Sequence, residues 1–572
     1  MSKEKKHTNY SADKKRDDII QLLSGLLIII LLNYLGSFAF DRIDLTADKR
    51  YSLTPPTVDK LNNLEDIITI KVYLAGDLPA HYKRLQDATK ELLDELRAYA
   101  GDQIQYEFVD PSAKEDEKKR KAFYQELSDR GLKYTNIRTR EIDKQSEQII
   151  FPGAILTYRD KELPLQLMQS SYDAPPEVMV NNSIQQLEYG VMSTVKKLTQ
   201  YAKKRVGIVQ GHGEANDLEL ADISKSLNDF YIVEPVEIEG KLDALKLYNA
   251  IIIAGPDSAY NEKDKYMIDQ FIMRGGKVMW FVEPVEVNMD SIRKNGITMA
   301  LPRELNLRDQ LFKYGARINS NLVLDLQSME IPIVTGMVGN RPRQEMFAWP
   351  YFPRVTPTSK HPIVNNLDAI KMQFTSSIDF VGNQGDSITK TPLLTTSQYS
   401  KVANAPHRVA LNILRNPPDP KQYNNPHQNV AVLLEGKFES LFKNRIAKAI
   451  AENPEFRFQE QSLPTSMIIA SDVSLIKNEI DDRKEIYYDL GYDRYSKHVY
   501  ANKQFVLNGL NYLLDNDGLI NARAKTFKLR LLDKQRIQSD KRNIQILNTA
   551  LPVVLILLFG IVRHFIRKKI YT

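Results

Sequence analysis

The sequence predicts an α/β protein in which two membrane helices, one near each end of the chain, flank a large region outside the cytoplasm. Two uncharged apolar runs lie near the termini, at 19–40 and 544–562. Between them, short apolar strands alternate with amphipathic helices. The 572 residues are 42% hydrophobic and 26% charged, which is typical of globular domains and excludes a wholly disordered chain or a channel built mostly of spans. At this length several domains are expected.

The first apolar run, Ile19–Phe40, contains LLSGLLIIILL and no charged residue. At about 1.5 Å per residue a helix of this length reaches ~33 Å, enough for a ~30 Å hydrocarbon core. A cleaved signal peptide is the alternative, but its apolar segment is usually only about 7–15 residues long. We therefore expect a cytoplasmic tail at 1–18 and a transmembrane helix at 19–40.

The second run, Ile544–Val562, is also uncharged and contains ALPVVLILLFGIV. Pro552 and Gly560 are tolerated in transmembrane helices, whereas a soluble helix this apolar would have to be buried on every side. The alternative is a buried C-terminal helix. We expect a second span at 544–562, followed by a cytoplasmic tail at 563–572.

The net charge of +6 lies entirely in the two tails, so the body of the chain is neutral. A nucleic-acid-binding protein would be expected to carry a basic domain, so this class is disfavoured. Six Lys/Arg precede the first span and four follow it within twenty residues, which favours a cytoplasmic N-terminus. The charges around the second span favour the opposite orientation, because eight Lys/Arg precede it in 523–542 and four follow it in the tail. The first helix usually determines the orientation, however. Residues 41–543 are therefore placed outside the cytoplasm.

The first soluble domain is expected at 41–203. Its pattern reads strand, helix, strand, helix, two strands and a final helix. The expected segments are Ile67–Gly76, Tyr82–Ala100, Gln103–Asp110, Glu115–Arg130, Gln148–Tyr158, Glu162–Leu167 and Ile184–Leu198. This order is that of a thioredoxin-like fold. Because the chain has no cysteine, such a domain can only be a scaffold or a binding surface, and disulfides and zinc-thiolate sites are excluded.

The second soluble domain is expected at 204–500. Near-continuous apolar strands alternate here with amphipathic helices, a pattern typical of a parallel sheet covered on both faces. The expected strands are Lys204–Gln210, Tyr231–Ile238, Ala250–Gly255 and Lys277–Glu283, with helices near Leu218–Phe230 and Glu262–Arg274. A turn-rich, extended insertion is expected at about 330–430, around Trp349, after which NVAVLLEG and SMIIAS resume the sheet. A helix near Phe505–Leu514 and a basic linker fill 501–543.

The candidate site lies where polar residues follow strands, since ligands of parallel sheets bind at the carboxyl ends of strands. Gly211-His212-Gly213-Glu214 links a strand to a helix, and Asp257 and Glu283 follow two further strands. In a functional interpretation His212 and Glu214 contact a ligand or a proton, with glycines allowing close backbone approach. In the alternative the glycines make a tight turn that His212 fills, and Asp257 caps a turn.

Sequence motifs for several enzyme classes are missing. Gly276-Lys277 and Gly436-Lys437 are not followed by Ser or Thr and lack the upstream glycine of a P-loop. The sequence has no HExxH zinc motif and no GxSxG elbow, and its eight histidines are scattered. We therefore predict no enzyme activity, no catalytic residue, no metal and no cofactor.

Several segments together resemble the GldG family, the gliding-motility-associated auxiliary subunits of Bacteroidetes ABC transporters. They are RYSLTPPTVDKL after the first span, the QGHGE turn, ANKQFVLNGLNYLLDNDGLINARAK and the terminal LPVVLILLFGIVRHFIRKKIY. The resemblance implies a GldA-like ATPase and a GldF-like permease as partners, in the bacterial inner membrane. It also implies that the doubly wound α/β domain is glutamine-amidotransferase-like, as in an intraflagellar-transport protein. That activity needs a cysteine nucleophile, which this chain lacks.

The predicted function is a non-catalytic auxiliary subunit of an ABC transporter linked to gliding motility. Its periplasmic domains would bind a substrate or couple to an envelope protein, in addition to the permease, the ATPase and membrane lipid. The alternative is a membrane-anchored carbohydrate-binding or hydrolytic module that uses the GHGE turn.

Overall fold

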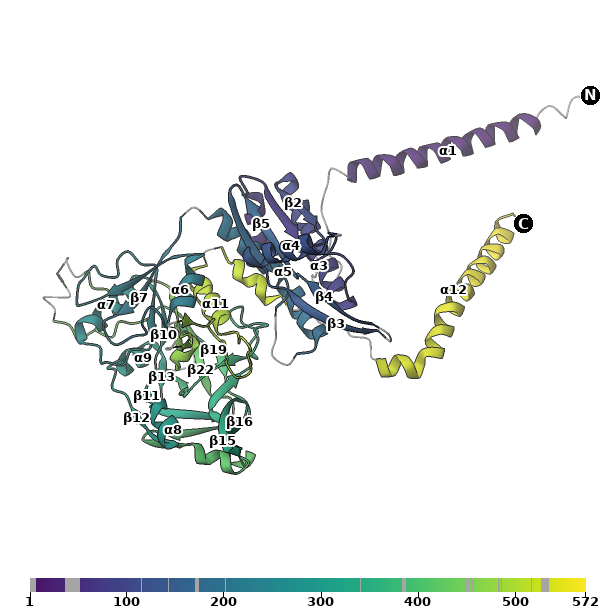
Figure 1. Cartoon of the computed structure of the whole chain (residues 1–572). Helices are drawn as coiled ribbons and strands as arrows, with labels where there is room; N and C mark the ends of the chain where they lie inside the picture. The colour runs from purple at the N-terminus through teal and green to yellow at the C-terminus, as the bar shows by residue number, and fades with distance from the viewer. Residues whose placement is uncertain are drawn as a thin grey trace, which may run out of the picture. The chain divides into compact units, whose positions relative to one another are not determined.

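The computed structural model describes residues 7–36, 52–525 and 534–571, with short gaps within the middle range at 115, 142–143, 170–173, 201, 340, 383–386, 448–451, 454–456, 482–483, 485 and 516. Two compact units are distinguished, one comprising residues 1–52 and the other residues 53–572. Each is described by itself below, with the element labels of Figure 1.

The first unit contains one described helix, α1 (His7–Gly36). Its apolar segment, Ile19–Tyr34, is shorter than the roughly 20 residues that a membrane span usually needs. The large apolar side chains of this segment are exposed. Residues 37–40 of the predicted first span lie outside the described residues, so this span stays a prediction.

The C-terminal helix α12 (Lys534–Tyr571) contains Ser539–Ile566, a segment long and apolar enough to cross a membrane. The predicted second span, 544–562, lies inside it, and Pro552 lies within the helix. The predicted basic linker, which extends to residue 543, overlaps the start of α12, because this helix begins at Lys534. Its polar start, KQRIQSDKRN, is rich in residues with good helix propensity, which permits the helix to extend beyond the apolar run.

The first domain of the second unit has a four-stranded sheet with the order β2-β1-β5-β6. β1 pairs parallel with β2 and antiparallel with β5, which pairs antiparallel with β6. Its elements are α2 (Pro55–Asn62), β1 (Ile68–Val72), α3 (Ala80–Ala100), η1 (Gly101–Gln103), β2 (Ile104–Phe108), α4 (Glu117–Asp129), β3 (Thr135–Glu141), β4 (Lys144–Ile150), β5 (Gly153–Tyr158), β6 (Lys161–Gln166) and α5 (Pro176–Thr199). Apolar residues of α2, α3 and α5 share one core with β1 and β5.

One element of this domain was predicted wrongly. The single strand expected at 148–158 is divided into β4, which pairs with β3 in a separate hairpin, and β5, which enters the main sheet. Phe151 and Pro152 separate the two strands. Proline has no N–H to donate to a ladder, which explains why the strand stops there.

The second domain is built on a seven-stranded sheet with the order β19-β22-β23-β10-β9-β7-β8. The five strands from β23 to β8 run parallel, and β22 and β19 are antiparallel to their neighbours. The predicted parallel sheet is therefore mixed at one edge. Its strands are β7 (Arg205–Gln210), β8 (Ile232–Glu237), β9 (Ala250–Ala254), β10 (Lys277–Phe281), β19 (Ile388–Thr395), β22 (Asn429–Gly436) and β23 (Thr465–Ala470).

Helices cover both faces of this sheet. α6 (Ala221–Asn228) and α11 (Asn502–Leu514) share a core with one face, and α7 (Glu262–Met273) and α9 (Arg308–Tyr314) share a core with the other. The fully buried strand β9 alternates between them, with Ile252 in the first core and Ile251 and Ile253 in the second. A strand buried on both sides explains the continuous apolar run AIIIA.

The predicted insertion at 330–430 differs from the structure in two ways. The short strands outside the main sheet begin before residue 330, at β11 (Val285–Glu286). β19 lies within 330–430 but belongs to the main sheet, where it pairs with β22 and where Leu393 and Leu394 are buried in the core. A long hairpin of β15 and β16 is visible in Figure 1. The remaining elements are β11 (Val285–Glu286), α8 (Met289–Asn295), β12 (Ile297–Pro302), β13 (Ala316–Ile318), β14 (Asn321–Asp325), β15 (Ser328–Val338), β16 (Arg341–Val355), β17 (Ile370–Lys371), β18 (Ile378–Phe380), β20 (Ser400–Asn404), β21 (His407–Ala410), η2 (Leu411–Arg415), η3 (Pro420–Gln422), η4 (Val473–Leu475), β24 (Ile480–Asp481), β25 (Ile486–Tyr487) and η5 (Leu519–Ala524).

Candidate functional site

The predicted site residues all lie at the carboxyl edge of the parallel strands. Gly211–Glu214 follow β7, Asp257 follows β9 and Glu283 follows β10. β7, β9 and β10 are neighbours in the sheet, so their ends lie side by side. The polar groups nevertheless form two clusters with different partners.

The first cluster is centred on His212, which is 7% exposed. Its Nε2 lies 3.0 Å from Asp264 Oδ2, and its Nδ1 lies 3.3 Å from Glu214 Oε1, within ion-pair range but outside hydrogen-bond geometry. The ring also stacks on Tyr260, with centroids 3.7 Å apart. Each ring nitrogen therefore faces a carboxylate, an arrangement that favours the imidazolium form.

The protonation of His212 follows from this geometry. Burial lowers the pKa of the ring, but Glu214 and Asp264 raise it more, so that the pKa lies above its ordinary value. The pKa of His212 is higher in the folded than in the unfolded state. The stabilisation of the fold by the protonated ring is therefore complete at acidic pH and is lost as the pH rises through the folded pKa. A ring that holds its proton between two buried carboxylates is poorly suited to act as a general base.

Glu214 is also fully engaged. Its Oε2 accepts from the backbone N–H of His212 at 2.7 Å, and its Oε1 accepts from the Tyr260 hydroxyl at 2.5 Å. Burial raises the pKa of Glu214, but these hydrogen bonds and the His212 ring outweigh it and lower the pKa. The Glu214 carboxylate therefore holds the GHGE turn in place by binding the backbone of the turn and the Tyr260 hydroxyl.

Asp257 meets the GHGE turn mainly through its backbone. Its N–H donates to the His212 carbonyl at 3.0 Å, while its exposed side chain accepts from the Ser258 hydroxyl. Gly213 has a φ of +74°, and a Cβ there would clash with Asp257 Oδ1. This position therefore requires glycine, both for its backbone conformation and for the close approach of Asp257.

Glu283 belongs to a second cluster, together with Asp472, which follows β23. Glu283 Oε1 accepts from the Val473 N–H at 3.3 Å, and Glu283 Oε2 lies 3.9 Å from Arg303 Nη1. Asp472 is fully buried, and burial together with the negative charge of Glu283 raises its pKa to about 7. Burial also raises the pKa of Glu283, against the attraction of Arg303. Two carboxyl groups that repel each other in this way titrate as a pair, and the pair keeps a proton to a higher pH than an isolated carboxyl group would.

Sequence reasoning missed Asp472, Asp264 and Tyr260. Asp472 follows the strand that SMIIAS predicted, so the rule that selected Asp257 and Glu283 could have found it too. Asp264 lies in the first turn of α7, where Asn261 caps the helix by accepting from the Asp264 N–H. Its second role, binding His212, depends on the approach of β7 to α7 and has no local signal.

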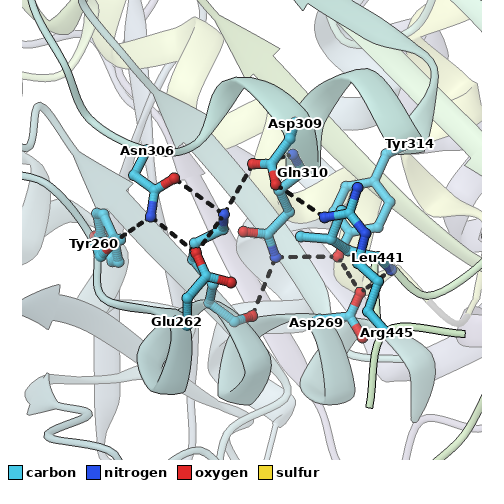
Figure 2. Close-up of polar contacts among 10 residues, drawn as sticks. Tyr260, Glu262, Asp269, Asn306, Asp309, Gln310, Tyr314, Leu441 and Arg445 are labelled. Carbon is cyan, nitrogen blue, oxygen red and sulfur yellow. Dashed lines mark hydrogen bonds and ion pairs between the residues drawn. The ribbon is translucent and has the colours of Figure 1, made fainter. Parts of the chain in front are cut away.

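Two buried charges on α7 were missed as well (Figure 2). Lys265 has a fully buried side chain, and its Nζ lies 2.9 Å from Asp309 Oδ1, 3.1 Å from Glu262 Oε1 and 3.3 Å from Asn306 Oδ1. Asp269 is likewise fully buried. It accepts hydrogen bonds from the Tyr314 hydroxyl at 2.8 Å, the Leu441 N–H at 2.9 Å, the Ser440 hydroxyl at 2.6 Å and the Gln270 amide at 3.0 Å.

These two charges bind α7 to distant segments of the chain. Lys265 ties the helix to α9 and the loop before it, and Asp269 ties it to α9 and to the turn after β22. Burial raises the pKa of Asp269, although its hydrogen bonds oppose the rise. Both carboxylate oxygens of Asp269 are matched by donors, so these hydrogen bonds stabilise the fold.

A cavity of about 510 Å³ lies between the first and second domains. Its lining includes none of the predicted site residues. Aromatic and amide side chains contribute to the lining, among them Tyr82, Tyr134, Gln169, Asn182, Asn366 and Gln504. Among the described residues, no group of three or more His, Asp or Glu side chains is arranged to hold a metal ion.

A family model described as an ABC-type uncharacterized transport system matches residues 203–509, and a domain of unknown function (DUF7088) matches residues 47–157. An uncharacterized protein of Borreliella burgdorferi is 22% identical over 569 residues, covering 97% of this chain and 99% of its own. The mmIFT52 N-terminal domain, aligned over 55% of this chain and 98% of its own, has 11% identity and a TM-score of 0.32, too low to support an argument about fold.

Proposed function

We propose, from the premise that this chain belongs to the family described as an ABC-type uncharacterized transport system, that it is a non-catalytic auxiliary membrane subunit acting with separate ATPase and permease subunits. The family match over 203–509 carries this proposal, because it spans the whole parallel part of the large sheet. The sequence has no P-loop, so ATP hydrolysis has to be supplied by another subunit.

The finer assignment is to the GldG-like subunits of Bacteroidetes gliding motility, with a GldA-like ATPase and a GldF-like permease. The terminal segments of the sequence support it, in particular the continuous stretch from ANKQFVLNGLNYLLDNDGLINARAK to the last apolar helix. In this assignment the first domain is a thioredoxin-like scaffold, and the second is a glutamine-amidotransferase-like domain without its cysteine. The two domains receive a substrate or pass conformational change to an envelope protein.

The proposed topology has two spans in the bacterial inner membrane and both termini in the cytoplasm. The apolar segment Ser539–Ile566 supports the second span, and the uncharged run 19–40 supports the first. Residues 41–543 are then periplasmic. Two spans are too few to enclose a transport path alone, which is a further reason for a permease partner.

The proposal of a non-catalytic subunit is supported by the GHGE turn. His212 and Glu214 are buried and engaged with Tyr260, Asp264 and the turn's own backbone. The polar groups that chemistry would need are therefore already used in holding the turn. Glycines Gly211 and Gly213 and the Asp257 carboxylate remain exposed and are available for binding rather than catalysis.

Purification of the full chain in mild detergent tests the assignment. We expect a permease with several spans and an ATPase with a P-loop to co-purify with it, because neither part is present in this chain. Identification by mass spectrometry of the co-purified proteins is the measurement. Recovery of a lone monomer or homodimer under conditions that keep other membrane complexes intact would contradict the proposal.

The substitution Glu214→Gln distinguishes a structural role of the GHGE turn from a hydrolytic role. The change keeps the side-chain shape but leaves one donor of the turn, the His212 N–H or the Tyr260 hydroxyl, without an acceptor, which should cost ~1–3 kcal/mol. In a strain lacking the native gene, the variant should restore the biological output in proportion to its membrane abundance. Normal abundance and normal assembly with an output reduced by ~100-fold or more would favour the hydrolytic or carbohydrate-binding alternative.

A further inference from the structure

Glu188, on α5, binds the two ends of the large extracytoplasmic region with one carboxylate. Its Oε1 accepts from the Thr54 N–H at 2.7 Å and from the Thr54 hydroxyl at 2.8 Å. Its Oε2 accepts from Lys525 Nζ at 2.6 Å. The Glu188 side chain is only 8% exposed, so solvent screens these charge-assisted hydrogen bonds weakly.

The two partners lie at opposite ends of the region between the apolar helices. Thr54 immediately precedes α2 and is the N-cap residue of that helix. Lys525 follows η5 and is the last described residue before α12. Although Thr54 and Lys525 are 134 and 337 positions from Glu188 in the sequence, they meet at the same side chain.

The C-terminal partner is fixed by more than one contact. Leu519 of η5 is buried in the core of the first domain. Arg523 is 4% exposed and donates to Gln186 Oε1 of α5 at 2.8 Å and to the Asn365 carbonyl of the second domain at 3.1 Å. Its guanidinium also lies 5.1 Å from the ring centroid of Tyr189 on α5. The segment that leads to α12 is thus attached to α5 and to the second domain together.

α5 in turn is shared by both domains. Its apolar face lies in the core of the first domain, and the Gln186 amide donates to the Asn366 carbonyl of the second domain at 2.8 Å. The Asn366 amide donates back to Gln185 Oε1 at 2.7 Å. A displacement of α5 therefore has to move or break contacts in both domains. α5 and η5 also lie outside both segments matched by family models.

We propose that Glu188 holds Thr54 and Lys525, at the two membrane-proximal ends of the periplasmic region, together on α5, so that a force applied to either of these ends acts on α5 and through it on both domains. The proposal rests on the proposed function only in taking both ends to be attached to the membrane. Glu188 acts through Thr54 and Lys525 and is a positioning residue. Glutamine cannot replace it fully, because one amide oxygen can serve only one of the two sets of donors.

Amide hydrogen exchange of the full chain in detergent tests whether Glu188 holds Thr54 and Lys525 in place. Glu188→Leu removes both acceptors at similar side-chain volume, so exchange should accelerate by about tenfold in the peptides covering 53–62 and 519–525 together. Lys525→Gln should accelerate only the second peptide. The matched control is Glu177→Gln, an exposed carboxylate on the same helix, which should change neither.

A second measurement covers the case in which Glu188→Leu does not fold. The chain has no cysteine, so spin labels can be placed on single cysteines introduced at the exposed positions Asn62 and Asn521. The distance between them should be narrowly distributed in the otherwise native chain and broader with the milder Glu188→Gln. Unchanged exchange in either peptide with Glu188→Leu, or an unchanged distance distribution with Glu188→Gln, would overturn the proposal. Both measurements use this chain alone, so they are independent of whether an ATPase and a permease co-purify.

Discussion

Replacing Asp269 with alanine should lower the free energy of unfolding of the second domain by about 3–5 kcal/mol. The carboxylate is fully buried and accepts hydrogen bonds from the Tyr314 hydroxyl, the Ser440 hydroxyl and the Leu441 N–H. Alanine leaves these donors without an acceptor in a site that is closed to solvent. The loss also releases α7 from the turn after β22, so the effect should spread beyond the site of mutation.

Asp269→Asn is the matched control. Its carbonyl oxygen can accept from Tyr314 and Leu441, and its amide can donate to Ser440 Oγ, so the loss should be about 2 kcal/mol or less. Both tryptophans of the chain, Trp280 and Trp349, are fully buried in the second domain, so their fluorescence during thermal unfolding reports on this domain. Equal destabilisation by alanine and asparagine would show that the hydrogen bonds of Asp269 are not the source of its contribution.

The Glu283–Asp472 pair should make the second domain less stable as the pH rises from about 4 to about 7. Burial, together with the charge of Glu283, raises the pKa of Asp472 from 3.8 to about 7. Between these values the folded state keeps a proton that the unfolded state has released, so the free energy of unfolding falls with increasing pH. A pKa difference of about three units corresponds to a loss on the order of 4 kcal/mol.

Glu283→Gln should reduce this loss. The variant removes the negative charge beside Asp472, so the pKa of Asp472 falls and less free energy is lost on ionisation. We expect the variant and the native chain to have similar unfolding temperatures at pH 5, and the variant to be the more stable at pH 8. Glu286→Gln, at an exposed carboxylate three residues away, is the control and should have no such effect. A variant and native chain that differ equally at both pH values would contradict the coupling of the two carboxyl groups.

The sequence predicted best the elements whose burial is uniform along their length. β9 and β23 are buried at every position, and their continuous apolar runs indicate strands of a parallel sheet without knowledge of their neighbours. α7 and α11 were recognised for a related reason, since a helix packed on a sheet needs apolar residues at a period near 3.6. β19 was assigned to the insertion instead, because its ITKTPLLT run mixes polar and apolar residues and contains a proline.

The candidate site was predictable only in part. The rule that polar residues follow parallel strands located His212, Glu214, Asp257 and Glu283, because this rule needs only the strand ends. It could not distinguish the two clusters into which these residues fall. His212 pairs with Asp264, and Glu283 is coupled to Asp472, through contacts between segments that are distant in the sequence.

By itself, the sequence determined the α/β class, the apolar C-terminal helix, the neutral body between basic tails, and the lack of cysteine chemistry. Each of these depends on local pattern or on composition, which no tertiary contact can change. Only the tertiary structure decided which charges are buried and what they bind. Lys265, Asp269 and Glu188 lie on helices whose sequences look ordinary, and each obtains its partners from segments distant in the chain. A charge can be buried only where the fold supplies its partners, and those partners are defined by packing rather than by spacing along the chain.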